Sequence, residues 1–478
     1  MRVFFVFLIV AFSSTAQAQQ VWSLDSCIRH ALDANISVKQ SELNLEVGEI
    51  NALQAKGGML PSLNAQGSHG YNWGQRIDPF TNQFASERIQ SNSFGVASSM
   101  TLFGGFTQWN SVKKAEIDRQ VAMWNVEKMK NDVALNVATA FLNLVVQKEV
   151  LAIAQNNLNL TEKQVVRISK LVEVGQLAQS NLNDILAQQA SDQANLIRSE
   201  NNVYLAKLSL TQLLLLTPEQ AANFDVSIPD LESMESQQIL SNVDAIVQAA
   251  LNNFPEIKSA EASVISAEYG YRIAQGSALP TLTASYSYGS GYSGASKVVT
   301  GTADSISYPI GQVFGTGEYV ISFEQPYYTS DDYATKSFSD QMRDNVNKSL
   351  FFNLNIPIFN GFSNYGNIRK AQINALNANY NLEQSKLNLT QSVERAYADA
   401  QASLANYRAA QLALDASQKS FEWVEKRYEQ GASNLFEYSD ARTRLDNANA
   451  TVLQNKYDFI FKLKVLDFYL GKPISLQP

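Results

Sequence analysis

The chain contains the same sequence pattern twice, and this duplication constrains its fold more than any other feature. The motif Leu60–Leu63 (LPSL) recurs 219 positions later as Leu279–Leu282 (LPTL). The aromatic-glycine motif Leu102–Phe106 recurs as Ile358–Phe362, but 256 positions later. The second copy therefore has 37 additional residues between these two motifs. This pattern implies two equivalent structural units, each with one loop that tolerates added length.

The first 18 residues have the pattern of an export signal. Arg2 precedes the apolar run Val3–Phe12, and Ala16 and Ala18 form a small-residue cleavage site, so we expect cleavage before Gln19. Beyond this segment we find no stretch of about 18 uncharged apolar residues, which argues against transmembrane helices. Any membrane crossing is then expected to be made by strands.

Charge and residue usage exclude several classes of function. The 45 acidic and 37 basic residues give a net charge of −8 without a basic run, so we expect no nucleic-acid partner. Cys27 is the single cysteine, and its place early in an amphipathic helix predicts a small core residue. The two histidines, His30 and His69, are far apart, and no catalytic motif is evident. We therefore predict neither an enzyme nor a metal or cofactor site.

Each structural repeat begins with a helical pattern that ends at glycine followed by proline, because proline cannot continue a helix. We place these helices at about 24–57 and 243–276, within repeats that cover 19–230 and 231–478. Between the repeats, the segment 217–241 is expected to add a short strand or a small helix.

Sequence with a period of two follows in each repeat and predicts four strands. Apolar residues alternate with small or polar ones in most of them. We expect strands at about 61–74, 92–103, 280–289 and 348–359. Their length matches a tilted membrane-crossing strand of about 9–11 residues. An ordinary surface hairpin is the alternative, but the export signal, aromatic residues near the strand ends and the Gly/Ser/Tyr-rich loop 289–347 favour membrane strands.

A long helical hairpin completes each repeat. No proline occurs over the 72 positions from Phe103 to Gly175, or from Phe359 to Gly431, which leaves room for roughly 100 Å of helix at about 1.5 Å per residue. With a return helix after each glycine, the hairpins cover about 107–216 and 363–470. Apolar residues spaced alternately by four and three indicate a heptad seam. They are Val137, Phe141, Leu144 and Leu151 in one copy, and Val393, Tyr397, Ala400, Leu404 and Tyr407 in the other.

Four strands cannot close a barrel, and an open edge in lipid leaves backbone groups unpaired. Closure therefore requires other subunits. Two copies of the chain would supply eight strands and three would supply twelve, and the residues alone do not decide between them.

The duplicated order of helix, LPxL motif, strand pair, aromatic-glycine motif and helical hairpin resembles the TolC-type outer-membrane efflux channel family over essentially the whole mature chain. The resemblance implies a mixed α+β membrane protein, a homotrimer whose twelve-stranded β-barrel continues into an α-barrel across the periplasm. It implies a place in the outer membrane, in contact with its lipid, with a periplasmic adaptor and an inner-membrane pump of RND or ABC type as partners. The implied function is the channel-tunnel of a tripartite efflux or type I secretion system, with the substrate left open.

In this family the turns between the long and return helices hold the gating residues. The second turn fits the family pattern, since Arg427 and Tyr428 precede Gly431, and Glu437 and Asp440 follow it by six and nine positions. The first turn fits less well. Leu171 replaces the arginine and Asn181 the first acidic residue, while Asp184 matches the second.

The resemblance thus implies a periplasmic gate formed by Asp184, Glu437, Asp440, Tyr428, Arg427 and Asn181. We expect Tyr428 to bond to Asn181 in place of an aspartate, and the turns at Gly175 and Gly431 to contact the adaptor. The alternative is an exported coiled-coil scaffold without channel activity, which explains the helices but neither the four alternating strands nor the tyrosine-rich loop.

Overall fold

The computed structural model describes residues 21–82, 84–85, 88–228 and 242–472. The expected export signal (1–18) lies outside the described residues, as do residues 229–241 of the linker. The chain separates into two compact units. The helical unit comprises Met1–Ile50, Glu116–Ser266 and Ala375–Pro478, and the sheet unit comprises Asn51–Ala115 and Ala267–Asn374.

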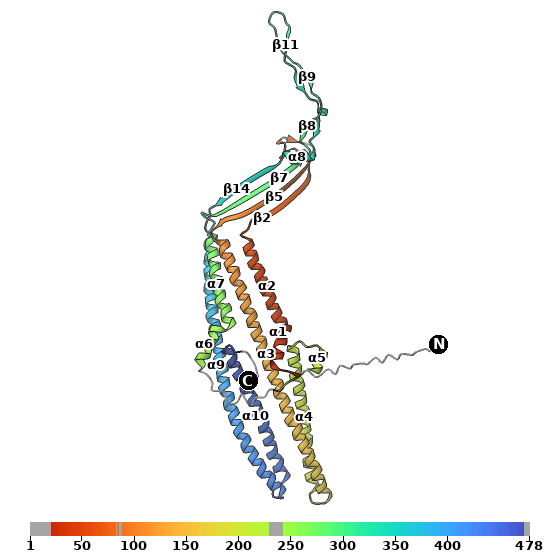
Figure 1. The fold of residues 1–478 in the computed structure, drawn as a ribbon, viewed down its shortest axis with the longest axis vertical. Coiled ribbons are helices and arrows are strands. Elements are labelled where there is room, and N and C mark those ends of the chain that lie inside the picture. Colours follow the sequence, from red (N-terminus) through yellow and green to blue (C-terminus); the bar gives the residue numbers. More distant parts are fainter. Residues whose placement is uncertain (1–20, 83, 86–87, 229–241, 473–478) are drawn as a thin grey trace, which may run out of the picture. The chain divides into compact units, whose positions relative to one another are not determined.

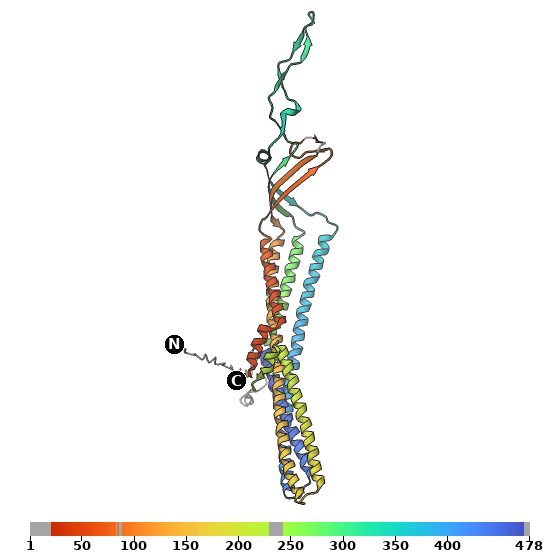
Figure 2. The ribbon, with the colours of Figure 1, turned by 90° about the vertical axis from the view of Figure 1, so that its right-hand side faces the viewer.

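Two long helical hairpins occupy the proline-free tracts. Helices α3 (Thr107–Glu173) and α9 (Ser363–Glu429) each have 67 residues. The return helices α4 (Gln179–Leu213) and α10 (Leu435–Tyr469) each have 35. The bounds of both pairs are displaced by 256 residues, the displacement of the aromatic-glycine motif. Within the helical unit the four helices run alongside one another (Figure 2).

The helix that we expected at the start of each repeat is broken into two. The bounds are α1 Leu24–Ala34, α2 Ile36–Gly57, α6 Val243–Asn253 and α7 Pro255–Gly276. At the first break, the side-chain oxygen of Asn35 accepts a hydrogen bond from the backbone N–H of Ser37 at 2.8 Å, so it caps α2. At the second, Pro255 has no N–H to donate and begins α7. The helical stretch that we expected in each copy is therefore present, as two consecutive helices.

The sheet unit contains a four-stranded antiparallel sheet in the order β14-β7-β5-β2 (Figure 1). The strands are β2 Ser62–Asn72, β5 Ile89–Gly104, β7 Thr281–Ser293 and β14 Asn347–Asn355. Strands β2 and β14 are therefore the two edges. Strand β14 ends four residues before the end that we expected, at Asn355, although the apolar alternation continues to Ile358.

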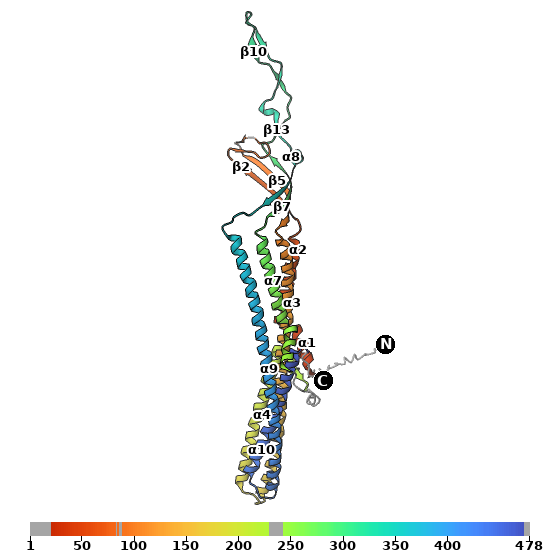
Figure 3. The same cartoon turned by 90° about the vertical axis from the view of Figure 1, so that its left-hand side faces the viewer.

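The 37 additional residues of the second copy fall in a chain of small hairpins between β7 and β14 (Figure 3). The paired strands are β8 Lys297–Val299 with β13 Tyr333–Thr335, β9 Asp304–Ile306 with β12 Gln325–Tyr327, and β10 Pro309–Gln312 with β11 Tyr319–Ile321. A 3-10 turn (Ser330–Asp332) and helix α8 (Phe338–Asp344) complete the segment. In the first copy, the described residues of the corresponding loop form only β3 (Arg76–Ile77) and β4 (Phe84–Ala85).

The linker between the repeats packs on the helical unit. It forms α5 (Pro218–Asn223) and β6 (Asp225–Val226), and β6 pairs in parallel with β1 (Val21–Trp22). Lys148 on α3 bonds to the Asp225 carboxylate at 2.7 Å and so fixes the linker to the long helix. We expected a short strand or a small helix in this segment, and its described part has one of each.

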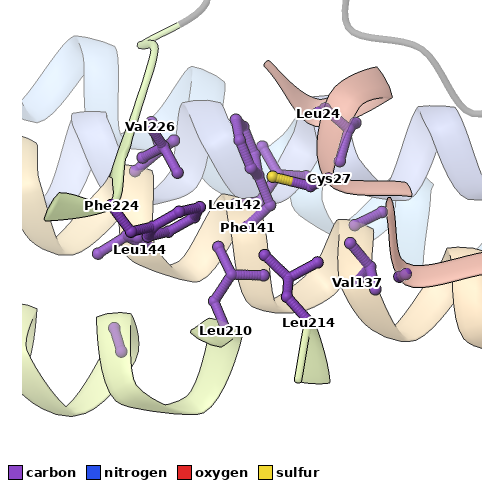
Figure 4. Close-up of a cluster of buried hydrophobic side chains, with 14 of the residues drawn as sticks. Leu24, Cys27, Val137, Phe141, Leu142, Leu144, Leu210, Leu214, Phe224 and Val226 are labelled. Carbon is purple, nitrogen blue, oxygen red and sulfur yellow. The ribbon is translucent and has the colours of Figure 1, made fainter. Parts of the chain in front are cut away.

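A hydrophobic cluster of the helical unit joins α1, α3, α4 and the linker (Figure 4). Val137, Phe141 and Leu144 of the heptad seam are each 1% exposed, and Val393 and Ala400 of the second seam are fully buried. Cys27 is also fully buried in this cluster, and burial raises the pKa of its thiol to about 12. The thiol is therefore a neutral core group, as we expected.

Helix α3 contains an 18-residue window that is long and apolar enough to cross a membrane, by length and composition alone. The expectation from the sequence concerned about 18 uncharged apolar residues, and it is not contradicted, because the uncharged run Val133–Gln147 on α3 is bounded by Asp132 and Lys148. The apolar side chains of α3 include Val137, Phe141 and Leu144, which belong to the hydrophobic cluster. In the single chain 33% of that window is buried, so α3 packs in the helical unit with part of its apolar surface.

Candidate functional site: the two helix turns

Both turns between long and return helices have the same backbone structure. Gly175 has φ +72° and Gly431 has φ +73°, in the left-handed region that favours glycine. The Gly431 N–H bonds to the carbonyl of Tyr428 at 3.0 Å, and the next N–H bonds to that of Arg427 at 2.8 Å. Gly175 and its successor repeat this pattern. Two hydrogen bonds of this kind form a Schellman motif, which ends a helix at a glycine.

The Arg427 guanidinium closes its own turn, because its Nη2 donates to the carbonyl oxygen of Ala432 at 3.0 Å. Arg427 is one of the residues that the resemblance assigns to the gate. In the single chain its donor is directed to the loop that follows Gly431. Leu171 occupies the equivalent position of the first turn and has no donor for such a bond.

Glu437 lies in the first turn of α10. Its backbone N–H bonds to the side chain of Asn434 at 2.8 Å, which caps the helix, and its carboxylate accepts a hydrogen bond from the Ser433 hydroxyl. A carboxylate at a helix N-terminus is also stabilised by the helix dipole. Glu437 thus serves the fold of the turn and still presents an exposed carboxylate.

The other two candidate gate carboxylates differ in their neighbours. Asp440 forms an ion pair with Arg444 at 2.8 Å, one helical turn further along α10. Asp184 is exposed on α4, and Gln188, not a basic residue, follows it by four positions. The negative charge of Asp440 is therefore partly compensated by a neighbour on its own helix, whereas Gln188 carries no charge that could do the same for Asp184.

Tyr428 does not form the bond that we expected from the sequence. Its ring stacks on Tyr438 of α10 with the ring centroids 4.9 Å apart, and no hydrogen bond between Tyr428 and Asn181 is present in the described part of this single chain. Burial raises the pKa of the Tyr428 hydroxyl, and nearby Arg167 opposes that shift. Arg167 lies one helical turn before Leu171, so a positive charge is present near Tyr428 although the first turn lacks the expected arginine.

The two tyrosines belong to a small apolar cluster that joins both hairpins near their turns. Its buried members, Ile168, Ile185 and Tyr438, come from α3, α4 and α10. Tyr438 is 5% exposed, and its hydroxyl accepts a hydrogen bond from Gln164 Nε2 at 3.3 Å. The cluster holds one hairpin to the other next to the candidate gate.

A polar layer that we did not anticipate lies beside this cluster. Asp192 on α4 accepts hydrogen bonds from Thr161 at 2.6 Å and Gln188 at 2.8 Å. Ser439 on α10 donates to Gln188 at 2.9 Å, so the layer crosses from one hairpin to the other. A difference between the two copies could have indicated this layer in the sequence. Arg442 and Asp446 of the second hairpin replace Leu186 and Ala190 of the first.

Arg442 and Asp446 extend the polar layer along α10. The Arg442 guanidinium donates to the backbone carbonyl of Asn157 on α3 at 3.3 Å and lies 3.6 Å from the Asp446 carboxylate. Burial raises the pKa of Asp446, and Arg442 only partly offsets this. Within the described residues, no group of three or more His, Cys, Asp or Glu side chains could hold a metal ion.

Comparison with known proteins agrees with this architecture. Residues 27–214 and 246–472 match the family described as outer membrane efflux protein. The outer membrane protein TolC of Escherichia coli is 22% identical over 485 residues, which cover 98% of this chain and 88% of TolC.

Solved structures show the same fold. The outer membrane protein VceC of Vibrio cholerae superposes with a TM-score of 0.72 at 16% identity, over 94% of this chain and 96% of VceC. The CmeC outer membrane channel of Campylobacter jejuni superposes with a TM-score of 0.71 at 15% identity, over 94% of this chain and 85% of CmeC. With the family match extending over most of its length, the chain is an outer-membrane protein and belongs to the outer membrane efflux protein family.

Proposed function

We propose that three copies of this chain, each built of the repeats 19–230 and 231–478, form a channel-tunnel through the outer membrane and periplasm. The channel passes substrates from an inner-membrane pump of RND or ABC type, through a periplasmic adaptor, to the exterior. Substrates diffuse through the open channel, and the channel does not modify them chemically. The observation that supports this proposal most strongly is the four-stranded sheet with two unpaired edges.

Among the described residues each edge strand of the sheet has one partner, since β2 pairs only with β5 and β14 only with β7. Exposed apolar side chains on β14, namely Leu350, Phe352 and Leu354, are 58%, 64% and 59% exposed. Lipid can cover these side chains, but it cannot satisfy an open strand edge. Pairing of β2 with β14 of the next copy closes the sheet, and three copies give twelve strands.

The helices also have unpartnered apolar faces. On α2, Ile36, Leu43, Val47 and Ile50 are 60%, 60%, 54% and 56% exposed, at spacings of seven, four and three. On α9, Ile373, Leu376, Tyr380 and Leu387 are 45%, 51%, 71% and 56% exposed, at spacings of three, four and seven. These are heptad positions that pack between helices in coiled coils. Contact of the α2 face with the α9 face of a neighbouring copy buries both.

The turns supply the gate and the adaptor contact in this proposal. Threefold repetition of Glu437, Asp440 and Asp184 places like charges in a confined opening. Like charges about 6–8 Å apart repel by roughly 2–3 kcal/mol per pair at an effective dielectric constant near 20. Arg444 compensates Asp440, so Glu437 and Asp184 supply most of the field, and cations are the favoured permeant ions.

The turn residues Gly175 and Gly431 mark the tips of the hairpins. Next to them Val174 is 68% exposed and Phe436 is 78% exposed. Apolar side chains presented beside exposed backbone turns suit the hairpin of a periplasmic adaptor.

Single-channel recording tests the proposed function. The purified protein in a planar bilayer should form a cation-selective conductance that multivalent cations block. A protein that binds membranes without conducting under any applied voltage, and that supports no transport with a pump and adaptor, would instead be an exported scaffold.

A further inference from the structure

Within one chain, the junction between β5 and α3 docks tightly against the end of α7. A Cβ on Gly105 would overlap the carbonyl oxygen of Gly276, and a Cβ on Gly276 would overlap the carbonyl oxygen of Gly105. Only glycine fits on either side of this contact. Beside it, β7 pairs with β5 to the end of that strand, with Thr281 opposite Gly104.

The duplication gives each partner of this contact a second version. Gly57 is the last residue of α2, as Gly276 is of α7, and lies 219 positions earlier. Gly361 lies 256 positions after Gly105 and has φ +63°, against +61° for Gly105. Yet a Cβ at Gly57 or at Gly361 would meet no atom within 4 Å in the described part of the chain. Both halves of the docking surface are present, and neither is occupied.

The early end of β14 also indicates that a neighbouring element is missing from the single chain. Strand β5 continues to Gly104, which corresponds to Asn360, but β14 ends at Asn355. The last residues of β5 pair with β7 alone, beyond the start of β2. The corresponding residues of β14 require a strand equivalent to β7, and that strand is β2. Within one chain β2 lies at the opposite edge of the sheet.

We propose that β2 of one copy pairs with β14 of the next in the register that β7 and β5 adopt within a chain, and that Gly57 docks against Gly361 across this junction. The inference rests on the proposed oligomeric channel and specifies its contact. Ser287 lies opposite Ala97 in the chain, so Ser68 lies opposite Asn353 of the next copy. Likewise Ser285 lies opposite Ser99, so Gln66 lies opposite Asn355.

Two further features agree with this register. The β7–β5 pairing has a bulge between Thr101 and Phe103, and Pro357 corresponds to Thr101. Proline has no N–H to donate and is tolerated in sheets at edges and bulges. Ile358 and Phe359 are 94% and 76% exposed in the single chain, whereas their counterparts Leu102 and Phe103 are 49% and 38% exposed. Pairing with β2 gives them the neighbours that their counterparts have.

Disulfide cross-linking between copies tests the register. The native Cys27 is fully buried, so introduced cysteines report alone. We expect Ser68→Cys with Asn353→Cys to form covalent dimers and trimers on mild oxidation of outer membranes. The matched control, Ser68→Cys with Asn355→Cys, changes the same residue type on the same strand two positions away. It should remain uncross-linked, because disulfides require Cα atoms within about 7 Å.

Substitution of glycines tests the docking contact. Gly57→Asn should lower the fraction recovered as the assembled oligomer by about tenfold, because the side chain meets a backbone in the next copy. The control is Gly366→Asn, on α9. Gly366 has equally open surroundings in the single chain, but its counterpart in the first copy is Asn110, so a side chain fits there.

The outcomes separate this inference from the proposed function. If the wild type is an oligomer but Asn355→Cys cross-links as well as Asn353→Cys, or neither cross-links, the register is wrong and the channel proposal stands. Assembly of Gly57→Asn at the level of Gly366→Asn overturns the glycine contact. A wild-type protein that remains monomeric in membranes overturns both.

Discussion

Replacement of Gly431 by valine should abolish transport without preventing assembly. The substitution strains the backbone, because φ is +73° and a left-handed conformation costs a residue with a Cβ roughly 1–2 kcal/mol. The added Cβ causes no steric overlap, since it would meet no atom within 4 Å among the described residues. A loss of this size lowers the melting temperature by less than about 4 °C in a chain of this length. The turn relieves the strain by changing its conformation, which displaces the bonds to Tyr428 and Arg427.

The assay compares transport in cells with the amount of oligomer in their outer membranes. Gly317→Val is the matched control, because Gly317 has φ +69° and equally open surroundings, but lies in the hairpins between β10 and β11. Transport should be lost in Gly431→Val and retained in Gly317→Val, with equal amounts of oligomer. Normal transport by Gly431→Val would show that the turn conformation is irrelevant to the gate and the adaptor.

Three further outcomes are expected. An epitope inserted at Gly315 should be accessible on intact cells, and access only after rupture of the outer membrane would reverse the proposed orientation. Glu437→Ala and Asp440→Ala should each reduce cation selectivity, because each removes one negative charge and Asp440→Ala also leaves Arg444 without its ion-pair partner; unchanged selectivity in bilayer recordings would show that these carboxylates lie away from the ion path. Burial raises the pKa of Asp446, so its ionisation lowers stability as the pH rises through that pKa. Asp446→Asn should therefore raise the melting temperature at pH 7, with the gain vanishing near pH 4, and a pH-independent difference would refute this reasoning.

Much of the fold follows from local sequence rules. The absence of proline between Phe103 and Gly175 sets the length of α3, and the left-handed glycine sets its end. The break at Asn35 also has a local cause, because the asparagine side chain caps the helix that follows it. Such a capping residue can be recognised in the sequence. Continuous apolar spacing across this position concealed the break, since both helices present an apolar face.

Other features depend on contacts that sequence reading does not supply. The end of β14 at Asn355 was not predicted, because the alternation continues beyond Ile356; in our proposal the missing element is a partner strand from a neighbouring copy. The site shows the same limit. Arg427 and Glu437 were identified by position, but their bonds to Ala432 and Ser433 lie within the turn. The polar layer joins α3, α4 and α10 across hundreds of residues, so no local pattern reveals it.

The mass of the intact assembly tests the central claim most directly. Native mass spectrometry of the protein, extracted from outer membranes in mild detergent, should give three times the mass of the processed chain. The unpaired edges of β2 and β14 then meet between neighbouring copies and close the sheet with twelve strands. A stable monomer would contradict the account, as would a dimer, whose sheet could contain only eight strands.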